Sequence, residues 1–158
     1  MAIRKSEIQL EVNGQKAHAD LASPDEGGQG VLVLHAWWGL TPFFKQVCDR
    51  LAGQGFVALA PDLRNGRIAK TIEEAKALME NSDGRFAGDA VMAAKDRLRG
   101  ITQGRIGLVG FSMGAGWSLI VASAVPEQRS ATVLFYGNEY ADYGKITSKV
   151  MGHHPSPP

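Results

Sequence analysis

Ser112 stands at the centre of a Gly-x-Ser-x-Gly pentapeptide that spans residues 110–114. An apolar run over residues 106–109 precedes it, and a proline-free segment rich in small residues follows it. This order predicts a strand, a tight turn that carries the serine, and a helix, which together form a nucleophile elbow. The two glycines suit such a turn, because a Cβ atom at Gly110 or Gly114 would collide with neighbouring backbone.

An elbow of this kind would give the Ser112 hydroxyl a place above the edge of a sheet, ready to attack a carbonyl carbon. The helix that begins beside it would direct backbone N–H groups toward an oxyanion formed there. The alternative is an ordinary glycine-rich turn, since the chain holds 19 glycines in 158 residues. The apolar strand before the pentapeptide and the helical segment after it favour the elbow.

Alternating strand and helix patterns predict the elements that must position this serine. A hairpin is expected around Asn13-Gly14, a dipeptide that favours a two-residue turn. Beyond it, buried strands and helices alternate, which is typical of a mostly parallel sheet covered by helices on both faces. The sequence predicts one α/β domain over residues 1–152 and a disordered tail over 153–158. The expected strands are 8–12, 16–21, 31–35, 56–60, 106–109, 131–136 and 148–151, and the expected helices are 42–52, 72–79, 86–98 and 113–124.

Composition excludes several classes of function. The 17 Lys and Arg residues nearly balance the 16 Asp and Glu residues, so no nucleic-acid partner is expected. No apolar run reaches membrane-spanning length and residues 1–7 lack a signal core, so a cytoplasmic protein with no membrane partner is predicted. Cys48 is the single cysteine and has the spacing of a buried helical residue, which favours packing over a reactive thiol. Nucleotide-binding glycine motifs are absent, and neither a cofactor nor a metal is expected.

Three blocks, over residues 31–40, 49–63 and 107–116, resemble in order and spacing the dienelactone hydrolase family of α/β-hydrolases. The resemblance implies a serine hydrolase of small ester or lactone substrates that works through an acyl-enzyme without a cofactor. It implies that the backbone N–H groups of Met113 and Trp37 form the oxyanion hole around the Ser112 reaction. The residues expected to line the substrate pocket are His35, Ala36, Trp38 and Phe111.

Two positions depart from the pattern of the family's namesake enzymes. Those enzymes use a cysteine nucleophile where this chain has Ser112, and they carry a glutamate where this chain has Ala36. That glutamate helps to control the thiol in those enzymes. The absence of this glutamate suits a serine nucleophile. It also puts dienelactone itself in doubt as the substrate.

The resemblance also implies that the triad acid follows the strand that ends near Gly152 and that the triad histidine comes later still. The 158-residue chain is therefore expected to lack both groups, together with the last strand and helix of the fold. Other residues are weaker candidates and have simpler explanations as hairpin, pocket, tail or surface-loop groups. These are the histidines His18, His35, His153 and His154, the acids Glu139 and Asp142, and the arginines Arg64 and Arg67, which could hold a substrate carboxylate.

Two further hypotheses remain open from the sequence. Without its acid and histidine the chain could be a catalytically inactive α/β domain that binds a small molecule or a partner chain. A strand at 148–151 left at the edge of the sheet would expose backbone groups and apolar side chains, so self-association through that edge is expected.

Overall fold

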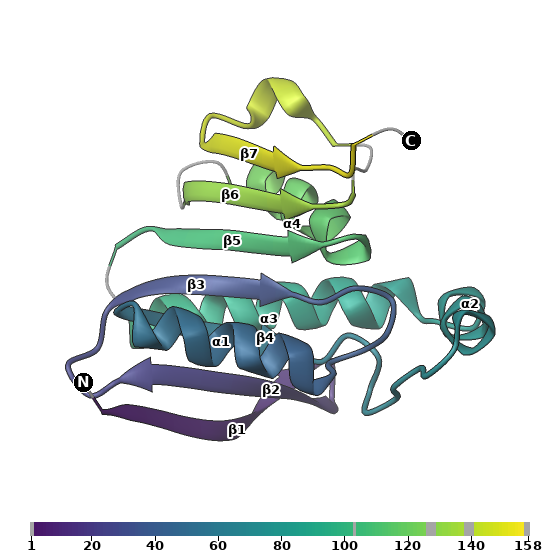
Figure 1. The fold of residues 1–158 in the computed structure, drawn as a ribbon, viewed down its shortest axis with the longest axis horizontal. Coiled ribbons are helices and arrows are strands. Elements are labelled where there is room, and N and C mark those ends of the chain that lie inside the picture. The colour runs from purple at the N-terminus through teal and green to yellow at the C-terminus, as the bar shows by residue number, and fades with distance from the viewer. Residues whose placement is uncertain (1, 103, 126–128, 138–140, 157–158) are drawn as a thin grey trace.

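A computed structural model describes residues 2–102, 104–125, 129–137 and 141–156. The described strands form one mixed sheet of seven strands in the order β1-β2-β4-β3-β5-β6-β7 (Figure 1). The strands are β1 (Ile3–Val12), β2 (Gln15–Pro24), β3 (Gln29–Leu34), β4 (Phe56–Pro61), β5 (Ile106–Phe111), β6 (Arg129–Phe135) and β7 (Lys149–His153). The helices are α1 (Pro42–Gly53), α2 (Ile72–Glu80), α3 (Gly84–Ile101) and α4 (Met113–Ala124), with a short 3-10 turn η2 (Tyr143–Lys145).

The N-terminal hairpin and the parallel core are both confirmed. Asn13 and Gly14 have φ angles of 47° and 78°, the left-handed values that a two-residue hairpin turn needs. The β1–β2 and β2–β4 pairs are antiparallel, whereas every pair from β4 across to β7 is parallel. The hairpin strands are longer than predicted, because their pairing continues from Ile3 opposite Pro24 through residues with no clear alternation.

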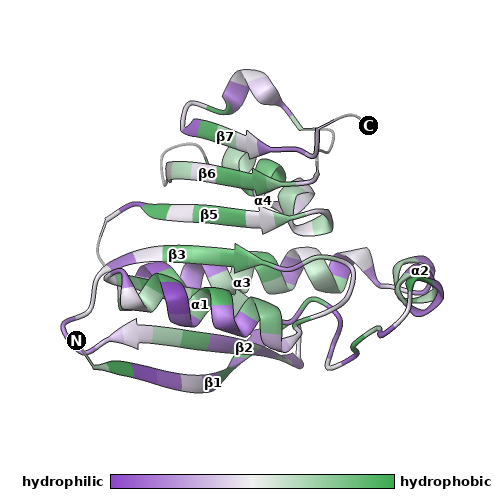
Figure 2. Cartoon of the chain, viewed as in Figure 1, coloured by the Kyte–Doolittle hydropathy of each residue, from purple (hydrophilic) through white to green (hydrophobic). Residues whose placement is uncertain are grey.

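Alternation along the central strands builds a core on each face of the sheet. In β3, Leu32 and Leu34 belong to the core formed with α3 and α4, while Val31 and Val33 belong to the core under α1. Because both faces of β3 are buried, this strand is a continuous apolar run. Apolar residues accordingly concentrate on the central strands, whereas β1 carries many polar residues (Figure 2).

Helical cover is uneven on the two faces. Helix α1 packs on β1 to β4, and α3 and α4 pack on the opposite face from β1 to β6. Strand β7 forms the edge of the described sheet, and all five of its residues are exposed. It ends two residues later than predicted, because His153 pairs with Phe135, so the first residue of the expected disordered tail belongs to the sheet.

None of the helices in the described ranges has the length and the apolar character that crossing a membrane would require. The cytoplasmic location inferred from the sequence stays a prediction.

Candidate active site

The turn at Ser112 has the strained geometry of an elbow. Ser112 joins β5 to α4 with φ 52° and ψ −109°, a conformation that L-residues rarely adopt. Its N–H donates a hydrogen bond of 2.7 Å to the carbonyl of Phe135 in β6, which holds the turn against the neighbouring strand. The residue is exposed, so its hydroxyl is not packed into the core.

Three glycines allow this turn to form. A Cβ atom on Gly110 would lie 2.3 Å from the carbonyl oxygen of Gly114, and one on Gly114 would lie 2.0 Å from the carbonyl oxygen of Leu34. A Cβ atom on Gly137, just after β6, would lie 2.3 Å from the carbonyl oxygen of Ser112. The pentapeptide predicts the role of Gly110 and Gly114 but not that of Gly137, whose signal in the sequence is a glycine directly after an apolar strand.

The two residues expected to supply the oxyanion-hole donors lie on segments that come together at this turn. Met113 is the first residue of α4, so its N–H has no acceptor within the helix. The close approach of Gly114 to Leu34 brings the first turn of α4 against the end of β3, where the loop that contains Trp37 begins. That loop is fixed by Gly39, whose φ is 94° and whose N–H donates to the carbonyl of Ala36 at 3.3 Å.

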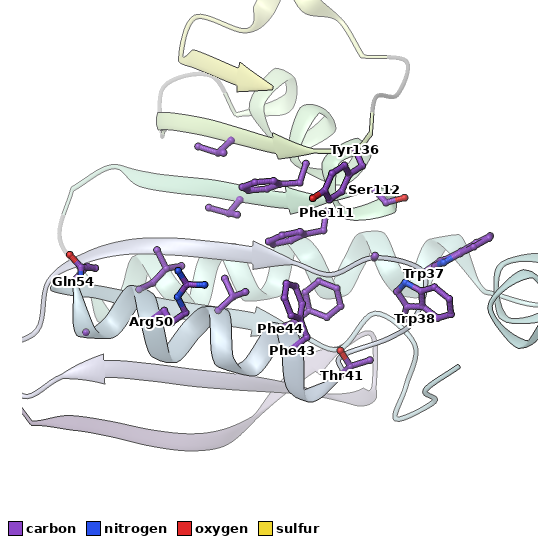
Figure 3. Close-up of a pocket in the computed structure, with 17 residues that line it drawn as sticks. Trp37, Trp38, Thr41, Phe43, Phe44, Arg50, Gln54, Phe111, Ser112 and Tyr136 are labelled. Atoms are coloured by element: carbon purple, nitrogen blue, oxygen red, sulfur yellow. The ribbon is translucent and has the colours of Figure 1, made fainter. Parts of the chain in front are cut away.

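An elongated cavity of about 1130 Å³ opens beside Ser112 (Figure 3). It runs along α1 and the adjacent face of β5 and β6, from Trp37 and Tyr136 to Arg50 and Gln54. Most of its lining is apolar, and aromatic rings dominate the end near Ser112. The lining residues are Ala36, Trp37, Trp38, Thr41, Phe43, Phe44, Val47, Arg50, Leu51, Gly53, Gln54, Val109, Phe111, Ser112, Val133, Phe135 and Tyr136. Ala36, Trp38 and Phe111, which the sequence placed in a pocket, are therefore among them.

His35 does not line this cavity, so its expected place in the pocket is corrected. The side chain is fully buried, its Nε2 accepts the N–H of Leu63 at 2.9 Å, and its Nδ1 lies 2.7 Å from the carbonyl of Ala36. Since Nε2 is an acceptor, Nδ1 carries the proton and donates to that carbonyl. Burial lowers the pKa of His35 to about 4, so the ring is neutral at pH 7. Both ring nitrogens are engaged, and His35 joins the Trp37 loop to the loop after β4.

Arg64 is buried, which corrects the interpretation of both loop arginines as solvated; Arg67 is exposed as expected. The Arg64 Nη2 atom lies 2.7 Å from the sulfur of Met79 and 2.9 Å from the sulfur of Met113, and Nη1 donates to the carbonyl of Leu78 at 3.4 Å. Burial lowers the pKa of Arg64. The residue therefore lies behind the elbow and does not line the cavity.

The other candidate residues contact groups other than the Ser112 hydroxyl. His18 is in β2 beside Glu7, and the ring of His153 stacks on Phe135 at 4.8 Å. Asp142 is exposed and pairs with Lys145, while Glu139 lies outside the described residues. Among the described residues, none hydrogen-bonds the Ser112 hydroxyl.

The predicted packing role of Cys48 fits its position in α1. Its side chain is fully buried, and burial raises the pKa of its thiol to about 12. Within the described part of the chain, no three His, Cys, Asp or Glu side chains gather as a metal site would require.

A serine on a strained strand-to-helix turn, above a largely parallel sheet with helices on both faces, defines the α/β-hydrolase fold. The pattern of the dienelactone hydrolase family matches residues 17–154, and the chain belongs to that family. The protein usf of Aquifex pyrophilus is 37% identical over 141 residues, which are 82% of this chain and 60% of that protein.

Solved structures agree with this assignment. The structure named m3DLH has a TM-score of 0.82 and 29% identity, and the match covers 98% of this chain and 69% of that one. The dienelactone hydrolase of Anabaena variabilis ATCC 29413 has a TM-score of 0.67 at 23% identity over 87% of this chain and 65% of that one, and it supports the fold. The chain spans about 60% of the length of the first curated relative it matches.

Proposed function

We propose that this chain carries the nucleophile and the oxyanion hole of a hydrolase that acts on small carboxylic esters or lactones. One observation supports this proposal above the others: Ser112 has a strained positive φ, is exposed and borders the large cavity. Strain of this kind persists only where the surrounding structure imposes it, and here neighbouring backbone on β3 and β6 does so.

In the proposed reaction, the Ser112 oxygen attacks the carbonyl carbon of the substrate and a bond forms between them. The N–H groups of Met113 and Trp37 stabilise the negative charge that develops on the carbonyl oxygen. The hydroxyl proton passes to a general base, which the described residues do not supply, and that base gives the proton to the leaving alcohol as the carbon–oxygen bond breaks. Water then releases the acyl group and regenerates the serine.

The end of the cavity near Ser112 supports an uncharged, apolar substrate, since Arg50 and Gln54 lie at the far end. Trp37, Trp38, Phe43 and Phe111 lie at the end near Ser112, and aromatic walls of this kind stabilise an acyl chain or a lactone ring by burial (Figure 3). The family's name points to the same class of substrate.

A second candidate function is a binding domain without catalysis. The observation that favours it is that no described residue hydrogen-bonds the Ser112 hydroxyl. No described side chain is therefore placed to take its proton as a base. A serine without a base is a weak nucleophile, so the two functions predict different reactivity at the same atom.

A fluorophosphonate probe separates the two. We expect the folded chain to be labelled faster than heat-denatured chain, and Ser112→Ala to abolish the labelling. Ser123→Ala is the matched control, because Ser123 lies on α4, the helix that follows Ser112, and its hydroxyl donates to the carbonyl of Ile120 in that helix. Release of p-nitrophenol from a short acyl ester then reports turnover. Labelling no faster than in denatured protein would leave only the binding function.

A further inference from the structure

Arg64 is a buried cation whose hydrogen bonds are incomplete. Its side chain belongs to a residue that is 4% exposed, yet its guanidinium reaches one carbonyl, at 3.4 Å, and the sulfurs of Met79 and Met113. Thioether sulfur is a weak acceptor. The Nε atom is buried without any hydrogen-bond partner. Five N–H donors therefore meet few strong acceptors.

Asp62 acts on this cation through its charge but does not contact the guanidinium. Asp62 accepts the backbone N–H of Arg64 at 2.9 Å and that of Gly66 at 2.7 Å, so its oxygens fix the turn after β4. Among the described residues, no carboxylate forms a salt bridge with the Arg64 guanidinium. A buried charge with neither an ion pair nor a full set of hydrogen bonds destabilises a fold.

The position of this charge indicates what it could stabilise. The Arg64 Nη2 atom lies 2.9 Å from the sulfur of Met113, the residue whose N–H is the proposed oxyanion donor. Negative charge at the substrate oxygen exists only during the reaction. A fixed positive charge nearby, in surroundings of low dielectric, favours that charge without any reorganisation.

We propose that Arg64 is a positioning residue for the serine reaction: its guanidinium holds the Met113 side chain and keeps a positive charge, in direct contact with no described carboxylate, behind the oxyanion hole. This inference rests on the proposed function and adds a residue that does not touch the substrate. The alternative is a purely structural role, in which Arg64 caps the last turn of α2 through the carbonyl of Leu78.

The test combines fluorophosphonate labelling with thermal unfolding. In labelling, the Ser112 oxygen bonds to phosphorus, the P–F bond breaks, fluoride leaves, and the hydroxyl proton passes to the buffer. Arg64→Met keeps the length of the side chain and removes the charge, and Arg64→Lys keeps the charge. Arg97→Met removes an exposed arginine from α3 and is the matched control for net charge, since Arg67 donates from its Nε atom to the carbonyl of Arg64 at 3.4 Å and is not independent of it.

We expect Arg64→Met to slow labelling about tenfold, as loss of a nearby charge should, while its unfolding midpoint equals or exceeds that of the parent chain. Arg64→Lys should stay within about threefold of the parent and Arg97→Met within about twofold, since the charge effect is local. If Arg64→Met is labelled as fast as the parent chain, the inference about Arg64 is overturned and the proposed function is not affected. The inference would also be overturned if both Arg64 variants unfolded at a clearly lower temperature and were labelled equally slowly, because a structural cap on α2 predicts that result. Failure of the parent chain to label would overturn the proposed function and this inference together.

Discussion

Replacement of Gly114 by alanine tests the close contact on which the elbow depends. The added Cβ atom would lie 2.0 Å from the carbonyl oxygen of Leu34 and 2.7 Å from that of His35. Carbon and oxygen atoms ordinarily stay about 3.3 Å apart, so α4 would have to move away from β3 by more than about 1 Å. Both obstructing atoms belong to backbone at the end of a buried strand, which cannot turn aside as a side chain can.

Overpacking of a core destabilises a protein by about 1–3 kcal/mol, and occasionally by more. For Gly114→Ala we expect the upper end of that range, about 3 kcal/mol, because backbone has to move. In a domain of this size each kcal/mol lowers the unfolding midpoint by about 2–4 °C, so the expected loss is about 6–12 °C. Labelling of Ser112 by a fluorophosphonate should fall as well, since the first turn of α4 carries the proposed oxyanion donor.

Circular dichroism during heating measures the first effect, and Gly100→Ala is its matched control. Gly100 lies in α3, and a Cβ atom there would meet nothing within 4 Å. Alanine forms helix better than glycine by about 0.8–1 kcal/mol, so this variant should unfold at a temperature equal to or above that of the parent. A Gly114→Ala variant that unfolds within about 2 °C of the parent would refute the close approach of α4 to β3.

Three further predictions follow from buried and exposed groups. Because burial lowers the His35 pKa from 6.5 to about 4, the unfolded chain binds the extra proton, and stability should fall by up to about 3 kcal/mol between pH 6.5 and 4; denaturant titrations should show a smaller fall in His35→Gln. A disulfide reagent at pH 8 should modify Cys48 only on unfolding, since its buried thiol has a pKa of about 12. Val150 and Met151 on β7 are 46% and 59% exposed. Light scattering at micromolar concentration should detect self-association that Met151→Lys weakens, and a monomeric parent chain would contradict it.

The fold could be predicted from the sequence because local pattern and global arrangement agree along most of the chain. The continuous apolar run at 31–35 indicated a strand buried on both faces, and Val31 and Leu32 do belong to opposite cores. The pentapeptide around Ser112 predicted a tight strand-to-helix turn, and Cβ atoms at Gly110 and Gly114 would indeed collide with neighbouring backbone there.

The surroundings of the site were harder to predict, because they depend on contacts between distant segments. Arg64 looks like a loop arginine in the sequence, and its burial depends on Met79 from α2 and Met113 from α4. His35 looked like a pocket residue because it ends a strand. Its partner Leu63 is 28 residues away, and the pairing requires the two loops after β3 and β4 to meet.

Because Gly137 contributes to the elbow, residues 110–114 do not form the turn by themselves. Backbone packs closely against the turn on both sides, since Gly114 lies against the carbonyl of Leu34 and Gly137 lies against the carbonyl of Ser112. Grafting the five residues 110–114 onto another sheet would therefore not reproduce the turn, because two flanking strands shape it. An engineer who wishes to transplant this serine has to move β3, β5 and β6 together with the start of α4.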